Sequence, residues 1–155
     1  MKAGAIVGGA SKEDAERLYE IGRLIGIAFQ LQDDVLDTYG DEKTFGKKIG
    51  GDIRVNKKTY LLIKALESLQ GKDRDDLVTL MTEPCFDEKE KFSRVVALYN
   101  KANVKGQTIE KISTYFAKAV QLLDQVQIDD LHKQELRLFM NELLLFIRSG
   151  HKVKE

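Results

Sequence analysis

Residues 22–37 read "GRLIGIAFQLQDDVLD", and the spacing of their apolar side chains decides the fold. At about 100° per residue on a helical wheel, the apolar positions gather on one broad arc, with Leu24, Ala28, Leu31 and Val35 near its centre. Together with the flanking apolar side chains, this arc covers more than half of the helix circumference. Because such a helix is largely buried, the stretch predicts a long core helix.

The flanks of this helix set its boundaries. Ser11 is a suitable cap, Asp14 can return the hydrogen bond three residues later, and Gly40 is a suitable stop. The rest of the chain also repeats apolar residues with a helical period and holds a single proline. The sequence therefore predicts an all-α fold, an antiparallel helical array with short connections. Further helices are expected at 57–69, 74–81, 88–102, 108–126 and 130–148, with a loop at 41–53.

Length and composition limit the possible functions. The chain has 155 residues, which suits one domain at 1–155, and its 25 basic side chains balance 25 acidic ones. This balance argues against nucleic acid or a membrane surface as partner, and no apolar run approaches the roughly 18 residues of a membrane span. Cys85 is the single cysteine, so a reduced, cytoplasmic setting is expected. The apolar start at 2–10 looks like the tail of a buried helix, so we expect a piece of a larger helical domain.

The polar stripe of the long helix carries clustered acids. Asp33 and Asp37 lie about 40° apart on the wheel, with Asp34 about 100° from Asp33, and Gly22 and Gly26 leave room beside them. Like charges at this spacing repel, and a partly buried carboxylate cluster needs a cation. With no His or Cys nearby, Mg²⁺ fits better than zinc, because it takes one or two carboxylates and fills its shell with water and substrate phosphates. A solvated acidic face without a ligand remains an alternative.

Residues 43–52, "KTFGKKIGGD", follow the acids with lysines set among glycines. Glycines allow a backbone to approach a ligand closely, and lysines supply point charges for phosphate. Lys57 comes just past this run, and Asp52 is placed to orient one of the lysines by pairing with it. Acids and lysines together fit one site that holds a diphosphate between them. An ordinary flexible surface loop is the alternative.

The two segments together resemble a known family. "FQLQDDVLD" at 29–37, followed by "GKKIGGDIRVNKKTYLLIKAL" at 46–66, closely resembles the second aspartate-rich region of trans-isoprenyl diphosphate synthases. These form the polyprenyl synthetase family, which includes the farnesyl and geranylgeranyl diphosphate synthases. The resemblance covers essentially the whole chain but only the C-terminal half of a family member. It implies the C-terminal part of the isoprenoid synthase fold, with the N-terminal half absent.

The resemblance also implies roles for individual residues. Asp33, Asp34 and Asp37 match the acids that bind Mg²⁺ and hold the allylic diphosphate. Lys47 and Lys57 match lysines that contact that diphosphate. Mg²⁺ and these lysines would stabilise the charge that develops on the leaving diphosphate.

Phe29 and Gln30 match a pair near the reacting carbons, where the carbonyl dipole of the glutamine faces the cation. The implied reaction is a prenyl transfer, in which isopentenyl diphosphate attacks the allylic carbocation and a proton is lost. Family members are usually homodimers, so we expect a homodimer in the intact enzyme. The family's first aspartate-rich motif is absent from these 155 residues, so we expect the chain alone to be inactive.

Three other functions stay open from the sequence. One is a terpene cyclase that shares the helical fold, although the lysine-rich run at 46–53 argues against it. The chain could be a non-catalytic helical subunit or regulator of a heteromeric prenyl synthase. It could also be a helical metal-binding protein unrelated to prenyl transfer, which predicts Mg²⁺ binding that diphosphate does not enhance. The apolar stripes of the last three helices are interpreted as core or subunit interface.

Overall fold

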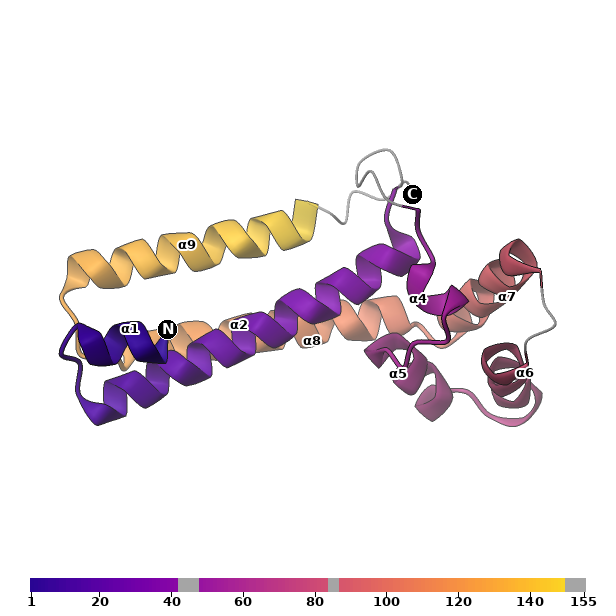
Figure 1. Ribbon diagram of the computed structural model, residues 1–155, viewed down its shortest axis with the longest axis horizontal. Coiled ribbons are helices and arrows are strands. Elements are labelled where there is room, and N and C mark those ends of the chain that lie inside the picture. Colours follow the sequence, from indigo (N-terminus) through magenta and orange to yellow (C-terminus); the bar gives the residue numbers. More distant parts are fainter. Residues whose placement is uncertain (42–47, 84–86, 150–155) are drawn as a thin grey trace. The chain divides into compact units, whose positions relative to one another are not determined.

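The computed structural model describes residues 1–41, 48–83 and 87–149, with side chains described up to Leu144. Within these ranges every regular element is a helix and no strand occurs, which confirms the predicted all-α class (Figure 1). No helix in the same ranges combines the length and the apolar character needed to cross a membrane. Cys85 lies outside the described residues.

The chain divides into two compact units. Of the described residues, the first unit contains Met1–Gln30 and 111–149, and the second contains Leu31–Glu110 apart from the ranges that are not described. Two helices, α2 (Lys12–Tyr39) and α8 (Val104–Asp124), pass from one unit to the other. Each unit has its own cluster of buried apolar side chains.

The first unit combines α1 (Lys2–Val7), the first part of α2, the later part of α8, and α9 (Asp130–Ser149). In Figure 1, α8 runs in the direction opposite to α2 and α9, as an antiparallel array requires. The apolar faces of α2, α8 and α9 meet in its core. The buried members of this core are Leu18, Ile21, Leu24, Ala119, Leu123, Val126 and Met140.

The start of α2 has the reciprocal cap that the sequence predicts. The hydroxyl of Ser11 donates to Asp14 Oδ2 at 2.8 Å, and the Asp14 amide donates to Ser11 Oγ at 3.1 Å. Asp14 also accepts from the backbone amide of Gln127 at 3.1 Å and from Arg17 at 2.9 Å. The hydrogen bond from Ser11 and then that from the Gln127 amide lower the pKa of Asp14. This carboxylate therefore ties the start of α2 to the connection between α8 and α9.

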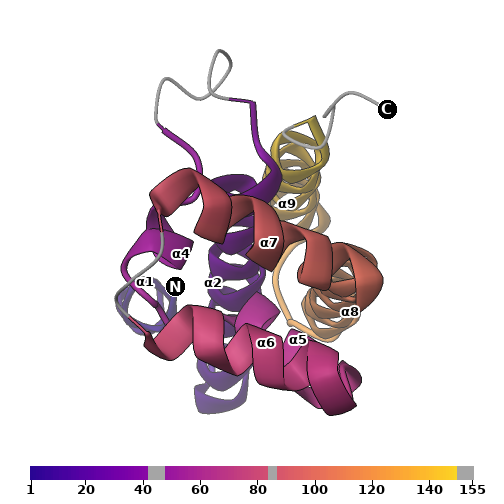
Figure 2. The same ribbon diagram turned by 90° about the vertical axis from the view of Figure 1, so that its right-hand side faces the viewer.

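The second unit contains the end of α2, the short α4 (Gly51–Arg54), α5 (Tyr60–Ser68), α6 (Gly71–Thr82), α7 (Glu88–Lys101) and the start of α8. Helix α7 packs against α4, α5 and α6, and Figure 2 shows these helices together facing the viewer. The core is built on Val35, Ile53, Leu61, Leu77, Leu80, Val95 and Tyr99, among others. At the start of α7, Asp87 accepts from the Lys89 and Glu90 amides at 3.0 and 3.1 Å.

Several predicted boundaries are wrong. Helices α6 and α8 begin at Gly71 and Val104, three and four residues before the predicted starts at 74 and 108, and two further differences lie near the candidate site. The end of the predicted loop, residues 51–53, belongs to α4, because the Gly50 amide donates to the Asp37 carbonyl at 2.5 Å and holds this segment against the end of α2. The helix predicted from residue 57 begins at Tyr60, where the Thr59 side chain accepts from the Leu62 amide at 3.3 Å. Lys57 therefore lies in the connection between α4 and α5.

Candidate functional site

Helix α2 places the acids of the motif by burying its opposite face. The predicted apolar arc is confirmed, since Leu24, Ala28 and Val35 are almost fully buried. Asp33 consequently projects into solvent, whereas Asp37 is half-buried. Asp34, on the flank of the helix, is only 5% exposed. Two of the three motif aspartates are therefore not on a solvated acidic face.

The carboxylate of Asp37 anchors α4. Its Oδ1 accepts from the Gly51 amide at 3.2 Å and its Oδ2 from the Asp52 amide at 2.8 Å. Burial raises the pKa of Asp37, and the hydrogen bond from the Asp52 amide partly opposes that rise. Gly50 has φ +79°, and a Cβ atom there would lie 2.5 Å from Cδ2 of Phe92. Only glycine fits this turn without strain, which explains one glycine of the motif.

Lys57 contacts both the α4 segment, through Asp52, and α2, through Asp34. Its Nζ lies 2.7 Å from Asp52 Oδ2 and 3.4 Å from Asp34 Oδ1. The hydrogen bond to Asp52 is the largest cause of a raised pKa at Lys57. The prediction that Asp52 pairs with a lysine is thus confirmed. One path of contacts runs from Asp37 through α4 and Asp52 to Lys57 and back to Asp34 on α2.

The carboxylate oxygens of Asp33 and Asp37 are ligands of the kind that a hard cation prefers. The described residues include no group of three His, Cys, Asp or Glu side chains arranged to hold a metal ion. Mg²⁺ does not require such a group, because one or two carboxylates with water and substrate phosphates commonly complete its shell. Asp33 and Asp37, one helical turn apart on α2, supply two carboxylates of this kind. The residues therefore fit a magnesium ion that is held jointly with a phosphorylated ligand.

The remaining predicted site residues lie at different places. Lys47 is outside the described residues. Phe29 and Gln30 are exposed on α2 before the acids, in the first unit. The sequence pattern gave no sign of Lys91 on α7, whose ammonium donates to the side-chain oxygen of Asn56, the residue before Lys57. That contact joins positions 35 residues apart, so no local signal could have revealed it.

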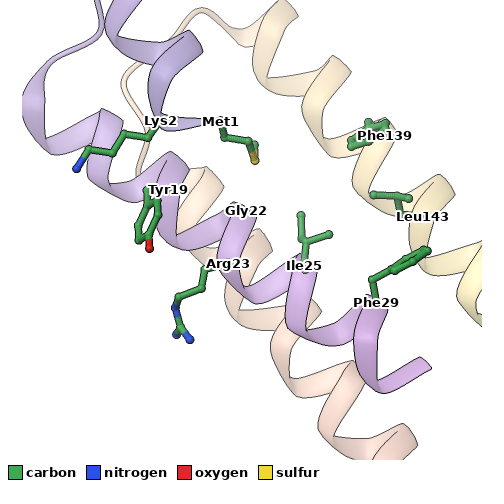
Figure 3. A pocket seen from close by; sticks show the side chains of 10 residues that line it. Met1, Lys2, Tyr19, Gly22, Arg23, Ile25, Phe29, Phe139 and Leu143 are labelled. Atoms are coloured by element: carbon green, nitrogen blue, oxygen red, sulfur yellow. The ribbon is translucent and has the colours of Figure 1, made fainter. Parts of the chain in front are cut away.

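An apolar groove of about 530 Å³ lies in the first unit. Figure 3 shows Ile25 and Phe29 of α2 and Phe139 and Leu143 of α9 extending toward the space between these helices. Its other lining residues are Met1, Lys2, Tyr19, Gly22, Arg23 and Gly26. A Cβ atom at Gly26 would meet nothing within 4 Å, whereas one at Gly22 would lie 3.2 Å from Sδ of Met1. Only Gly26 therefore leaves open space, and it does so at this groove. The part played by α9 was missed, because its apolar stripe was interpreted as core or subunit interface.

Comparisons with known proteins identify the family and the fold. A family model described as polyprenyl synthetase matches residues 1–101. A short chain isoprenyl diphosphate synthase of Methanothermobacter thermautotrophicus is 46% identical over 80 residues, which cover 52% of this chain and 25% of the relative. The crystal structure of a geranylgeranyl pyrophosphate synthase matches with a TM-score of 0.82 and 33% identity, covering 92% of this chain and 44% of that one. These matches confirm the predicted isoprenoid synthase fold.

A further solved structure was obtained with ligands. It is the geranylgeranyl pyrophosphate synthase from Corynebacterium glutamicum complexed with isoprenyl diphosphate and magnesium. It matches with a TM-score of 0.77 and 28% identity over 90% of this chain and 40% of that one. The present chain thus spans less than half the length of each of these three proteins.

Proposed function

Because this chain belongs to the polyprenyl synthetase family, we propose that it carries the magnesium–diphosphate site of a trans-prenyltransferase of isoprenoid biosynthesis. The whole enzyme would condense an allylic diphosphate with isopentenyl diphosphate. The observation that carries this proposal is the position of Lys57, held between Asp52 and Asp34. A lysine held in that way beside the acids of α2 is suited to bind a diphosphate together with Mg²⁺.

Asp33 and Asp37 are the proposed principal magnesium ligands. Asp33 is exposed, and each oxygen of Asp37 accepts one backbone hydrogen bond and retains a second lone pair. Asp34 is proposed as a third ligand on the family resemblance of the motif alone, because in the described residues its carboxylate contacts Lys57 at 3.4 Å and forms no three-carboxylate group with the other two. When bound, Mg²⁺ stabilises negative charge on the leaving diphosphate. The choice of magnesium is supported by the similar Corynebacterium protein, which was solved with isoprenyl diphosphate and magnesium.

Lys57 is the proposed diphosphate-binding cation. An ammonium group has three N–H donors, and two of them are directed to Asp52 and Asp34. Its side chain is 44% exposed, so the third donor is available to an oxygen of the ligand. Charge-assisted hydrogen bonds of this type are stronger than neutral ones. Lys47 is the proposed second lysine on the same diphosphate.

Gln30 and Phe29 are proposed to face the organic part of the allylic substrate. Gln30 lies one helical turn before Asp33 and Asp34 on α2, where its carbonyl dipole can stabilise positive charge on the allylic carbon. Phe29 lines the apolar groove of the first unit together with Phe139 and Leu143. That groove has the apolar character that a hydrocarbon chain requires.

The proposed reaction also requires a binding site for the second substrate, isopentenyl diphosphate. The relatives are more than twice as long as the part that this chain matches, and we propose that isopentenyl diphosphate binds to residues in the unmatched part. This chain would then bind the allylic diphosphate but not turn it over alone. For the whole enzyme we propose a homodimer in the cytoplasm.

Calorimetry with an unreactive allylic thiolodiphosphate tests this function, with Mg²⁺ and then with EDTA. We expect Mg²⁺-dependent binding that Asp33→Asn and Lys57→Met each weaken about tenfold or more, because each removes a charged contact. Lys58→Met is the matched control, since Lys58 is the exposed neighbour, and it should change the affinity less than about twofold. Equal affinity in Lys57→Met and Lys58→Met would refute the assignment. Mg²⁺ binding that the ligand does not enhance would show that these acids bind the metal independently of a diphosphate, against the proposed joint site.

A further inference from the structure

We propose that Lys91 is a positioning residue, which holds Lys57 in its binding orientation by fixing the turn at Asn56. This inference rests on the proposed function of Lys57, although the contacts that suggest it do not. Lys91 belongs to α7, outside the motifs at 29–66 that carry the family resemblance, and within the described ranges its side chain donates to Asn56 and to none of the proposed magnesium ligands. Its effect would be transmitted through one side chain, that of Asn56.

The surroundings of Lys91 are unusual for a lysine. The residue is only 8% exposed. Moving an ammonium group out of water costs free energy unless the group gains strong partners. Among the described residues Lys91 forms no ion pair, and its Nζ donates instead to Oδ1 of Asn56. A lysine with this partner contributes little as a surface charge. Its evident effect is to fix the Asn56 side chain against α7.

Asn56 has an uncommon backbone conformation. Its φ is +54°, in the left-handed region that non-glycine residues rarely adopt and that asparagine tolerates better than most. The Asn56 amide donates to the Ile53 carbonyl at 3.2 Å, and the next amide, that of Lys57, donates to the Asp52 carbonyl at 2.9 Å. This turn reverses the chain directly after α4. It therefore sets the direction in which Lys57 leaves the backbone.

Helix α7 contacts the α4 segment near both of its ends. Phe92, the neighbour of Lys91, lies against Gly50, where a Cβ atom would come within 2.5 Å of its ring. Lys91 holds Asn56 just past the last residue of α4. The segment between these two points contains Asp52, the main partner of Lys57. Loss of the Lys91 contact would release one end of this segment and leave the other end in place.

The expected consequence is a change in population. Without Lys91, Asn56 would leave the left-handed conformation for part of the time, and Lys57 would face the acids in only a fraction of molecules. The apparent association constant for a diphosphate is then the intrinsic constant multiplied by that fraction. If Lys91 acts only through Lys57, removing Lys91 should have no effect on affinity once Lys57 is already absent.

A double-mutant cycle tests this expectation with the magnesium-dependent binding of the unreactive allylic thiolodiphosphate. Lys91→Met should weaken binding about fivefold, and Lys91→Arg, which keeps a donor, should restore most of the loss. In the Lys57→Met background, Lys91→Met should change affinity by less than about twofold. Lys89→Met is the control, because Lys89 is an exposed lysine two residues before Lys91 on the same helix. An equal loss in both backgrounds would overturn the proposal.

A second measurement does not depend on the function of Lys57. The three-bond HN–Hα coupling of Asn56, measured by NMR in the chain without ligand, reports the φ of that residue. It should change in Lys91→Met and stay constant in Lys89→Met. If Lys57→Met binds the ligand as the wild type does, the proposed function fails. An unchanged Asn56 coupling in Lys91→Met overturns the present inference, whatever the result for Lys57→Met. If Lys91→Met does not fold, Asn56→Ala removes the same contact from an exposed position, and unchanged ligand affinity in that variant overturns it.

Discussion

Asp52 donates its backbone amide to Oδ2 of Asp37 across 2.8 Å, although 15 residues separate the two positions. The Asp52 carboxylate meanwhile contacts Lys57 at 2.7 Å. Burial is the main cause of the raised pKa of Asp37, and repulsion from the Asp52 carboxylate adds to it. A backbone hydrogen bond thus holds two acids together although their carboxylates repel one another. Asp37 consequently has a structural role in α4 in addition to its proposed role as a magnesium ligand.

Asp37→Asn should separate these two roles in the absence of Mg²⁺. An asparagine has one acceptor oxygen, so one of the two backbone amides, Gly51 or Asp52, would lose its acceptor. We expect the free energy of unfolding to fall by about 1–3 kcal/mol and hydrogen exchange at that amide to accelerate. Asp33→Asn is the control, since Asp33 is exposed, and its urea midpoint should match that of the wild type. Equal midpoints for both variants would contradict the anchoring role of Asp37.

Gly50→Ala should destabilise the chain for two separable reasons. The backbone at Gly50 has φ +79°, and the added Cβ would also lie 2.5 Å from the Phe92 ring. Gly71 has φ +55° with nothing within 4 Å of a Cβ, so Gly71→Ala isolates the backbone strain. We expect a loss of about 1–2 kcal/mol for Gly71→Ala and about 2–5 kcal/mol for Gly50→Ala, in which overpacking adds to the strain.

Urea unfolding followed by circular dichroism measures both glycine variants. A Phe92→Leu substitution in the Gly50→Ala background should recover part of the excess loss, because it removes ring atoms from the clash. No recovery, or equal losses at Gly50 and Gly71, would show that the Phe92 ring does not constrain this turn.

The sequence predicted α2 well because one periodic pattern determines its faces. The apolar arc from Leu24 to Val35 is buried, and the Ser11–Asp14 cap forms as expected. Such features depend on neighbours within one or two turns, where residue type and spacing are informative. The sequence likewise predicts that Asp52 pairs with a nearby lysine, and the structure identifies that lysine as Lys57, five residues away.

The parts that the sequence did not predict depend on distant contacts. Helix α4 lies in a glycine-rich run that is typical of a loop, and it forms where Asp37 accepts the Gly51 and Asp52 amides. Asn56 is an ordinary turn residue in the sequence, and its link to Lys91 becomes visible only once α7 packs against α4. The contribution of α9 to the groove likewise depends on tertiary packing that no local pattern encodes.

Gly26→Leu should test the groove separately from the diphosphate site. A Cβ at Gly26 meets nothing within 4 Å, so the larger side chain enters open space in the groove and should not destabilise α2. We expect about tenfold weaker binding of the unreactive allylic thiolodiphosphate, because its hydrocarbon chain loses apolar contact area. Magnesium-dependent binding of inorganic pyrophosphate should change less than about twofold.

The matched control for the groove is Ala117→Leu, which adds the same side chain at an exposed position of α8. Calorimetry with both ligands on both variants gives the comparison. If Gly26→Leu weakened pyrophosphate as much as the allylic ligand, or weakened neither, the groove would not be the site of the hydrocarbon chain.

Asp14 should make the stability of the first unit sensitive to low pH. The Ser11 hydroxyl and the Gln127 amide lower its pKa below the ordinary value of 3.8. A carboxyl group with a lower pKa in the folded state stabilises that state at every pH above its unfolded value, and the stabilisation is lost as pH falls through the folded pKa. Asp14→Asn should therefore be less stable than the wild type at pH 7, by an amount that shrinks as the pH falls below about 4.

Urea midpoints at pH 7 and in steps down to about pH 2.5, recorded for both proteins, measure this difference. Glu13→Gln is the control, because Glu13 is the exposed acid beside Asp14 in the same helical turn. Its midpoint should follow that of the wild type at every pH. A gap between wild type and Asp14→Asn that stays constant across this range would show that the charge of Asp14 does not matter. The link from the start of α2 to Gln127 would then depend on hydrogen-bond geometry alone.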